Sequence, residues 1–208
     1  MEYIRLAAGL PVDALEVDVR MSPEGVLVLT HDPAADRQPV TMEEAFTFLS
    51  EKNVLINCDL KEYGLEDAVA ACAKKCGVAE ERLIFTGSVT DCRNFRLTHP
   101  LTRVFINAEE LIPDFYMSMA DEATRETAVS GLAEACMSAG YDVININYRA
   151  LCDTALSALK DAGISISAWT VDDGENMKRM AAAGVINMTT NCPILAAEIL
   201  EKATGRNK

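Results

Sequence analysis

The sequence has few basic clusters. Among its 208 residues no run of Lys and Arg is longer than two, and 32 acidic side chains outnumber 19 basic ones, which gives a formal net charge of −13. Because a nucleic-acid backbone or an anionic bilayer attracts clusters of Lys and Arg, this balance argues against wide binding to either. We therefore expect partners among small molecules and cations, and no nucleic acid.

Long apolar runs are also missing. No stretch approaches the roughly 18 consecutive apolar residues of a membrane-spanning helix. Met1 leads into an amphipathic segment rather than into the basic and apolar regions of a signal peptide. We expect no stable membrane insertion and a cytoplasmic location for the chain as written, while a signal peptide upstream of Met1 would change that location.

The seven cysteines include no C-x-x-C pair. An odd count without such a pair indicates reduced thiols rather than a disulfide framework. Cys72 and Cys76 are four residues apart on an expected helix and have a spacing that a shared metal would allow. Two small buried side chains are the interpretation that we favour.

Glycine-rich phosphate loops are absent as well, since neither G-x-G-x-x-G nor G-x-x-x-x-G-K occurs. What is present is an alternation of β-branched runs and helical patterns. We expect strands at seven positions: residues 14–19 with 26–29, 54–59, 83–86, 103–107, 143–147, 164–170 and 184–189. We expect helices at residues 2–9, 42–51, 65–76, 91–97, 124–139, 151–162, 175–183 and 194–202.

Repeated β-α units without a linker predict one α/β domain, residues 1–208, with a parallel sheet covered by helices. The missing glycine-rich turn favours a (β/α)₈ TIM barrel over a doubly wound sheet. Thr41 and Glu44 predict a capping box at the start of the second helix. Four glycines follow helical runs and are expected as left-handed helix caps: Gly77, Gly140, Gly163 and Gly184.

Two acidic residues alternate with apolar residues in the strand at residues 14–19. Glu16 and Asp18 project from one face, while the apolar side chains occupy the other. Two adjacent carboxylates inside a barrel need a cation or a proton, and oxygen ligands suit Ca²⁺ or Mg²⁺. The alternative is a solvent-facing strand with two acids.

The next strand places Asn57, Asp59 and Lys61 on one face by the same period of two. A divalent metal with a lysine beside it suits a phosphate ester, because both draw charge from the phosphoryl oxygens. A simple Asp–Lys ion pair is the alternative. His31 follows an apolar strand and is a natural acid or base near neutral pH, although a structural histidine remains open. His99, which precedes Pro100, is expected to be incidental.

Four segments carry a resemblance to a known family. The segment DALEVDVRMSPEGVLVLTHDP closely resembles the motif of the glycerophosphodiester phosphodiesterase family, in which a Glu-x-Asp-Val strand, an Asp/Glu-Gly turn and a His-Asp dipeptide follow in this order. The likeness continues through QPVTMEEAF, LINCDLKE and AWTVDDGENMKRMAAAGVINMTTNCP. It covers essentially the whole chain.

This resemblance implies a (β/α)₈ barrel that hydrolyses glycerophosphodiesters to glycerol 3-phosphate and an alcohol. It also implies a Ca²⁺ or Mg²⁺ ion held by Glu16, Asp18 and Asp59. His31 matches one of two catalytic histidines, which act in that family as general acid and base while a hydroxyl of the substrate attacks phosphorus. By the same resemblance Lys61 contacts the phosphate and Trp169 is an aromatic of the substrate wall.

The chain departs from the family pattern at several places. Asp59 stands where the family usually has Glu, and Asn191 stands where it often has Asp. Residues 34–38 replace a longer insertion, so we expect a less covered pocket. Residues 108–123 are expected to form either a substrate-side loop or an intersubunit contact.

The largest departure concerns the first strand. The family opens with a strand that bears His-Arg-Gly, whereas this chain begins inside the helix that follows it. We therefore expect an incomplete barrel that lacks its first strand and one catalytic histidine, with Met1 an internal methionine of a longer gene product. We expect impaired activity, and open edges on the second and eighth barrel strands that favour a homo-oligomer.

Two other functions stay open at this point. The chain is alternatively a non-catalytic phosphodiester-binding or assembly domain derived from the same barrel. A related activity on lysophospholipid or sphingolipid head groups is a third interpretation. The sequence does not name the alcohol half of the substrate.

Overall fold

The computed structural model describes residues 1–33, 39–90 and 92–204. The segment at residues 34–38, for which we expected a less covered pocket, lies outside these residues. The chain divides into two compact units, Met1–Val104 and Phe105–Lys208, and each is described by itself. Within the described ranges, none of the helices combines the length and the apolar character that crossing a bilayer requires.

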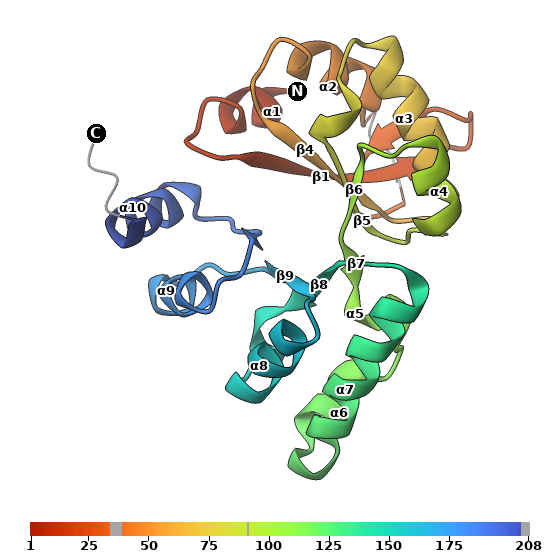
Figure 1. The fold of residues 1–208 in the computed structure, drawn as a ribbon. Helices are drawn as coiled ribbons and strands as arrows, with labels where there is room; N and C mark the ends of the chain where they lie inside the picture. Colours follow the sequence, from red (N-terminus) through yellow and green to blue (C-terminus); the bar gives the residue numbers. More distant parts are fainter. Residues whose placement is uncertain (34–38, 91, 205–208) are drawn as a thin grey trace. The chain divides into compact units, whose positions relative to one another are not determined.

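The first unit contains one six-stranded sheet with the strand order β3-β2-β1-β4-β5-β6 (Figure 1). Strands β1, β4, β5 and β6 are parallel neighbours, and the short β2 and β3 add to the edge of β1 in antiparallel order. The strands are β1 (Ala14–Met21), β2 (Leu27–Leu29), β3 (Val40–Thr41), β4 (Leu55–Leu60), β5 (Leu83–Gly87) and β6 (Arg103–Val104).

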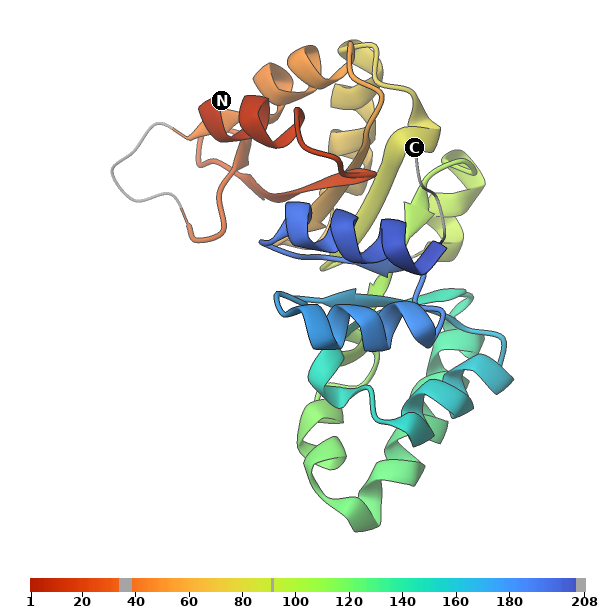
Figure 2. The ribbon, with the colours of Figure 1, turned by 90° about the vertical axis from the view of Figure 1, so that its left-hand side faces the viewer.

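The helices of this unit are α1 (Glu2–Ala7), α2 (Met42–Leu49), α3 (Glu66–Lys75) and α4 (Cys92–Thr98), with a 3₁₀ turn η1 (Glu80–Arg82). Helices α2 and α3 lie side by side, and α2 packs against β2 and β3 (Figures 1 and 2). The contact is apolar because Met42, Phe46 and Leu49 form one fully buried stripe along α2.

The capping box at the start of α2 is confirmed. The Thr41 hydroxyl accepts a hydrogen bond from the Glu44 backbone N–H at 3.2 Å, and the Glu44 carboxylate accepts one from the Thr41 N–H at 2.9 Å. Two backbone donors at the helix end are thereby satisfied, and a cap of this kind is typically worth about 1 kcal/mol.

The second unit contains a four-stranded parallel sheet in the order β10-β9-β8-β7. Its strands are β7 (Ile106–Asn107), β8 (Val143–Asn147), β9 (Ser165–Trp169) and β10 (Asn187–Met188). Its helices are α5 (Ala108–Leu111), α6 (Phe115–Ala120), α7 (Glu122–Ala139), α8 (Asp153–Asp161), α9 (Gly174–Ala182) and α10 (Pro193–Thr204), with a 3₁₀ turn η2 (Tyr148–Ala150). Helices α6 and α7 lie alongside each other (Figure 2).

A row of polar side chains crosses this second sheet. Hydrogen bonds of 2.8 to 2.9 Å link neighbouring register partners from strand to strand, in the order Asn107, Asn145, Ser167 and Asn187. Ser167 is fully buried and Asn145 nearly so. Their burial is tolerated because each polar group finds its partner in the row.

The expected strands and helices are present, while β3 was not expected and β10 is shorter than the expected strand at residues 184–189. Two further stretches differ. Residues 103–107 were expected as one strand, but Phe105 interrupts the pairing, and β6 and β7 join different sheets. Residues 108–123 were expected as a loop or an intersubunit contact, and most of this stretch forms α5 and α6. The four glycine caps are confirmed by positive φ angles of 74° to 82°.

The expected open edge on the second barrel strand is only partly present. That strand is β1, and its residues Val19, Arg20 and Met21 pair with β2. The turn at Gly25 returns the chain to this edge and so protects the carboxyl-terminal part of it. In the part of the chain that the structure describes, β10 pairs with β9 alone.

Candidate metal centre

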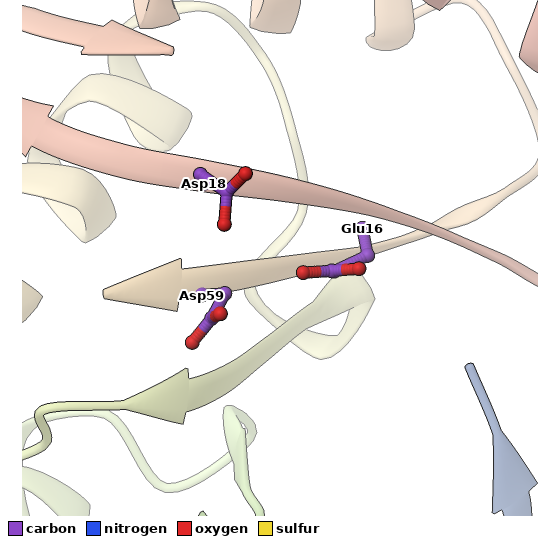
Figure 3. A group of neighbouring side chains, drawn as sticks. All are labelled: Glu16, Asp18 and Asp59. Carbon is purple, nitrogen blue, oxygen red and sulfur yellow. The ribbon is translucent and has the colours of Figure 1, made fainter. Parts of the chain in front are cut away.

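Three carboxylates from β1 and β4 converge on one face of the first sheet (Figure 3). Glu16, Asp18 and Asp59 each offer one oxygen, and these oxygens all lie within 4.8 Å of one another. Asp18 and Asp59 are direct register partners, and Glu16 pairs with Asn57 two residues earlier on each strand. The sequence therefore brings the expected acids together through a period of two on β1 and a parallel register with β4.

The opposite face of β1 fixes this orientation. Leu15, Val17 and Val19 are buried in the apolar core, with Val19 fully so. A shift of the register by one residue would place these apolar side chains on the acidic face. Burial of the alternate residues thus keeps Glu16 and Asp18 together on the other face, as the sequence pattern predicts.

The donor set fits a hard divalent cation. Ca²⁺ binds oxygens at about 2.3–2.6 Å, so two oxygens that share one ion lie within about 5 Å of each other. The 4.8 Å limit on this cluster meets that condition. Carboxylate oxygens without nitrogen or sulfur donors favour Ca²⁺ or Mg²⁺ over the softer transition metals.

The electrostatics of the cluster show an excess of negative charge. Packing of protein around the Glu16 carboxylate raises its pKa from 4.5 to about 7, and the nearby charges of Asp59 and Asp18 contribute to this rise. The positive charges of Lys61 and His31 act in the opposite direction but do not compensate. A divalent cation at this place would relieve the repulsion.

The Lys61 ammonium provides a positive charge beside the clustered acids. Its Nζ lies 2.8 Å from Asp18 Oδ1 and 2.5 Å from Asp59 Oδ2. Burial alone would lower the pKa of the Lys61 ammonium, but its hydrogen bonds and ion pairs with these two aspartates outweigh burial and raise it. Lys61 is thus held in its charged form beside the acids.

Two residues of β5 support Asp59 from the next strand. The Thr86 hydroxyl lies 3.3 Å from Asp59 Oδ1 and 3.1 Å from Asn57 Oδ1. Gly87 has a φ of 78°, and a Cβ there would lie 2.4 Å from Asp59 Oδ1 and 2.2 Å from the Leu60 carbonyl oxygen. Sequence reasoning missed both residues, and the Thr-Gly pair at the end of an apolar strand is the only signal for them.

His31 lies just beyond β2, and its side chain is exposed. Its Nδ1 is 3.1 Å from Asp32 Oδ1, and its backbone carbonyl accepts a hydrogen bond of 2.9 Å from Arg20 Nε. Arg20 also forms an ion pair of 3.1 Å with Glu62, just after the Lys61 position. One arginine therefore ties the backbone at His31 to the segment that carries Lys61.

The second histidine has different neighbours. The His99 ring stacks on Phe95 with ring centroids 4.5 Å apart, and its Nδ1 lies 2.9 Å from the Thr98 hydroxyl. These neighbours belong to the end of α4 and include none of the clustered acids. His31 remains the histidine with an electrostatic effect on Glu16.

Trp169 belongs to the second unit, at the end of β9. Its ring meets the Tyr116 ring edge-on, with centroids 6.4 Å apart. Its role in a substrate wall stays a prediction.

The contacts of Asn191 explain the asparagine at this position. Its backbone N–H and side-chain amide both donate to the Asp172 carboxylate, at 2.7 and 3.0 Å. Burial opposes the charge of Asp172, but the hydrogen bonds from Asn191 and Thr190 lower its pKa. An aspartate at position 191 would lack the amide donor and would place a second negative charge beside Asp172. The contact with Asp172 therefore explains why asparagine suits this position.

Comparisons with known proteins agree with the motif resemblance. No family model matches the chain. The chain is 21% identical to a protein named glycerophosphodiester phosphodiesterase from Caldanaerobacter subterraneus subsp. tengcongensis, over 94% of this chain and 89% of that protein. The two sequences therefore align over nearly their whole lengths.

Solved structures resemble the chain over similar lengths. A glycerophosphodiester phosphodiesterase from Parabacteroides distasonis matches with a TM-score of 0.75 and 18% identity, over 98% of this chain and 90% of that one. A phosphodiesterase from Oleispira antarctica, in complex with the product sn-glycerol-3-phosphate, matches with a TM-score of 0.70 and 16% identity, over 96% and 90%. The chain therefore has the (β/α)₈ TIM-barrel-like fold of the glycerophosphodiester phosphodiesterases.

Proposed function

We propose that the chain hydrolyses glycerophosphodiesters to glycerol 3-phosphate and an alcohol with the help of a divalent cation, Ca²⁺ or Mg²⁺. The observation that carries this proposal is the convergence of Glu16, Asp18 and Asp59 within 4.8 Å beside the Lys61 ammonium. The fold shared with glycerophosphodiester phosphodiesterases supports it, as does the solved relative that holds sn-glycerol-3-phosphate.

The three acids would hold the cation through one carboxylate oxygen each. A bound divalent cation would withdraw charge from the phosphoryl oxygens of the substrate. Lys61 would serve the same end from the protein side. Its ammonium now contacts Asp18 and Asp59, and a cation on those carboxylates would leave its donors to a phosphoryl oxygen.

His31 is proposed as the general acid that protonates the leaving alcohol oxygen. Its exposed ring leaves Nε2 accessible to a substrate, while Nδ1 lies 3.1 Å from the Asp32 carboxylate. A carboxylate at Nδ1 orients the ring. An acid or base of this kind typically contributes about 10²–10⁴-fold to the rate.

We also propose that turnover by this chain is slow. The sequence contains two histidines, and His99 packs against Phe95 and Thr98. His31 would therefore act without the second acid–base histidine that the family motif includes. A rate lower by about 10²–10⁴ than that of a two-histidine enzyme is the expected consequence.

Release of glycerol 3-phosphate from glycerophosphocholine tests the proposal. We expect slow release that a chelator abolishes and that Ca²⁺ or Mg²⁺ restores. The substitution Asp59→Asn should remove both the release and the binding of Ca²⁺ measured by calorimetry. Asp67→Asn is the matched control, because Asp67 is a strongly exposed carboxylate on α3.

Two results would count against this function. Release that persists in a metal-free sample with Asp59→Asn would exclude the acid cluster from the chemistry. Binding of glycerophosphocholine without any release, at protein concentrations that detect one turnover per hour, would favour a phosphodiester-binding domain instead.

A further inference from the structure

Two buried polar side-chain atoms in the described part of the chain lack a hydrogen-bond partner, and both lie in the second unit. They are Glu109 Oε2 and Trp169 Nε1. Buried polar atoms in native proteins nearly always have a partner, so such an atom indicates a water, an ion or a ligand. One atom is an acceptor on an acidic group and the other is a donor.

Tyr116 joins the two groups. Its ring meets the Trp169 ring edge-on at 6.4 Å, and its hydroxyl shares a hydrogen bond with the Glu109 carboxylate. The same hydroxyl accepts a hydrogen bond of 3.1 Å from the Asn147 backbone N–H. The Tyr116 hydroxyl therefore lies beside the Glu109 carboxylate, whose Oε2 has no hydrogen-bond partner among the described residues.

These residues share one edge of the second sheet. Asn147 and Trp169 are the last residues of β8 and β9, and Glu109 is the second residue after β7. The carboxyl ends of parallel strands are where ligands bind in α/β folds. The unsatisfied atoms thus belong to residues at the end of the sheet where a ligand is expected.

The chemistry of the cluster suits a ligand that carries a positive charge and, close to it, an oxygen atom. A buried carboxylate oxygen binds a charged donor more strongly than a neutral one, and tyrosine and tryptophan rings attract organic cations. The net charge of −13 raises the local concentration of cations further. The indole N–H needs an acceptor, and a hydroxyl or ester oxygen would provide it.

We propose that Glu109, Tyr116 and Trp169 form a binding site for an amino-alcohol group, with its ammonium on Glu109 and its oxygen on the Trp169 N–H. The group is a free amino alcohol, and its binding does not depend on the function proposed above. Glu109 would select for the positive charge of this ligand.

The fluorescence of Trp169 measures this binding directly, because it is the single tryptophan of the chain. We expect ethanolamine, titrated into the full chain at neutral pH and constant ionic strength, to change the emission in a saturable manner. Ethylene glycol has the same length without the charge, and it should bind at least tenfold more weakly. No saturable change with ethanolamine, or equal binding of both compounds, would overturn the proposal and leave a bound water as the partner of these atoms.

Variants distinguish the role of Glu109 from that of the overall negative charge of the chain. Glu109→Gln keeps the shape of the side chain and should weaken ethanolamine binding at least tenfold. Glu110→Gln, next to it on α5, is the control and should bind like the unmodified chain. If Glu109→Gln does not fold, as judged by its thermal transition, Tyr116→Phe serves instead, because it releases the Glu109 carboxylate. Unchanged binding in the folded variant would contradict the proposal.

A further variant tests whether this binding is independent of the acid cluster. Asp59→Asn in the presence of a chelator should bind ethanolamine like the unmodified chain, so failure of the phosphodiesterase proposal does not affect this test. Loss of saturable binding in this variant would overturn the assignment of the site to Glu109, Tyr116 and Trp169.

Discussion

Asp18 and Asp59 face each other as register partners on the parallel strands β1 and β4, and one ammonium, that of Lys61, contacts both carboxylates. Like charges on adjacent strands repel. The lysine and a divalent cation would therefore act on the same pair of carboxylates. A change at Lys61 should alter both the stability of the chain and its response to Ca²⁺.

Lys61→Gln should destabilise the chain in the absence of divalent cations. The three side chains of this ion-pair cluster are at most 31% exposed. Loss of one partner from a fully buried pair costs about 3–5 kcal/mol, and partial exposure reduces our expectation to about 1–3 kcal/mol. Chemical denaturation with and without Ca²⁺ measures the effect, and Ca²⁺ should stabilise Lys61→Gln more than the unmodified chain.

Lys75→Gln is the matched control for this change. Lys75 forms an ion pair of 2.7 Å with Glu43, but both side chains are more than half exposed. Such a surface pair contributes about 0–1 kcal/mol. Equal losses in the two variants would show that the position of Lys61 between two aspartates has no special role.

The sequence predicts much of the acid cluster because its geometry is local. Alternation along β1 fixes the shared face of Glu16 and Asp18, and the same period places Asp59 and Lys61 together on β4. The register of β1 against β4 depends instead on packing of the apolar face, which a single sequence does not specify. The support of Asp59 by Thr86 and Gly87 follows from the register of β4 against β5, which packing also decides, and was missed for this reason.

The cluster of Glu109, Tyr116 and Trp169 could not be predicted from the sequence. Residues 108–123 contain two short helices of four and six residues. Isolated helices of this length are unstable, so their sequences carry little periodic signal, and tertiary contacts decide them. The sequence therefore left residues 108–123 as a substrate-side loop or an intersubunit contact, and only the fold places the Tyr116 ring against that of Trp169.

The raised pKa of Glu16 gives the metal-free chain a specific pH dependence. The unfolded chain loses the proton of this carboxyl near pH 4.5, whereas the folded chain retains it up to about pH 7. Between these values the folded state binds more protons than the unfolded state, so stability should fall as pH rises from about 4.5 to 7. Free energies of unfolding at several pH values, in chelator, measure this slope.

Glu16→Gln should remove that contribution, so the difference between the two proteins isolates it. Glu44→Gln provides a contrast of opposite sign. The hydrogen bonds of Thr41 lower the pKa of Glu44, and the stability from this residue is lost as pH falls. A difference curve for Glu16→Gln that is flat across pH 4.5 to 7 would contradict the charge excess at the cluster.

His31→Ala should lower the release of glycerol 3-phosphate by about 10²–10⁴-fold while leaving the thermal transition nearly unchanged. The reason is that the His31 side chain is exposed and contributes little to packing. His99→Ala is the reverse case, because it removes a ring stacked on Phe95 and should affect stability more than rate. Retention of more than about a tenth of the rate in His31→Ala would refute its role as general acid.

Gly87→Ala should crowd Asp59, one of the three clustered acids, from the neighbouring strand β5. A methyl group at Gly87 would lie 2.4 Å from Asp59 Oδ1 and 2.2 Å from the Leu60 carbonyl oxygen, in addition to the strain of a φ of 78°. The strain costs about 1–3 kcal/mol, and overpacking adds about 1–3 kcal/mol. Displacement of Asp59 should also weaken Ca²⁺ binding, which calorimetry measures.

Gly77→Ala separates strain from crowding. Gly77 has nearly the same φ, 77°, but a Cβ there meets no atom within 4 Å. It should therefore show the cost of strain alone and bind Ca²⁺ as the unmodified chain does. If Gly87→Ala binds Ca²⁺ with unchanged affinity while still folding, Asp59 can move without loss, and its fixed position is not what holds the ion.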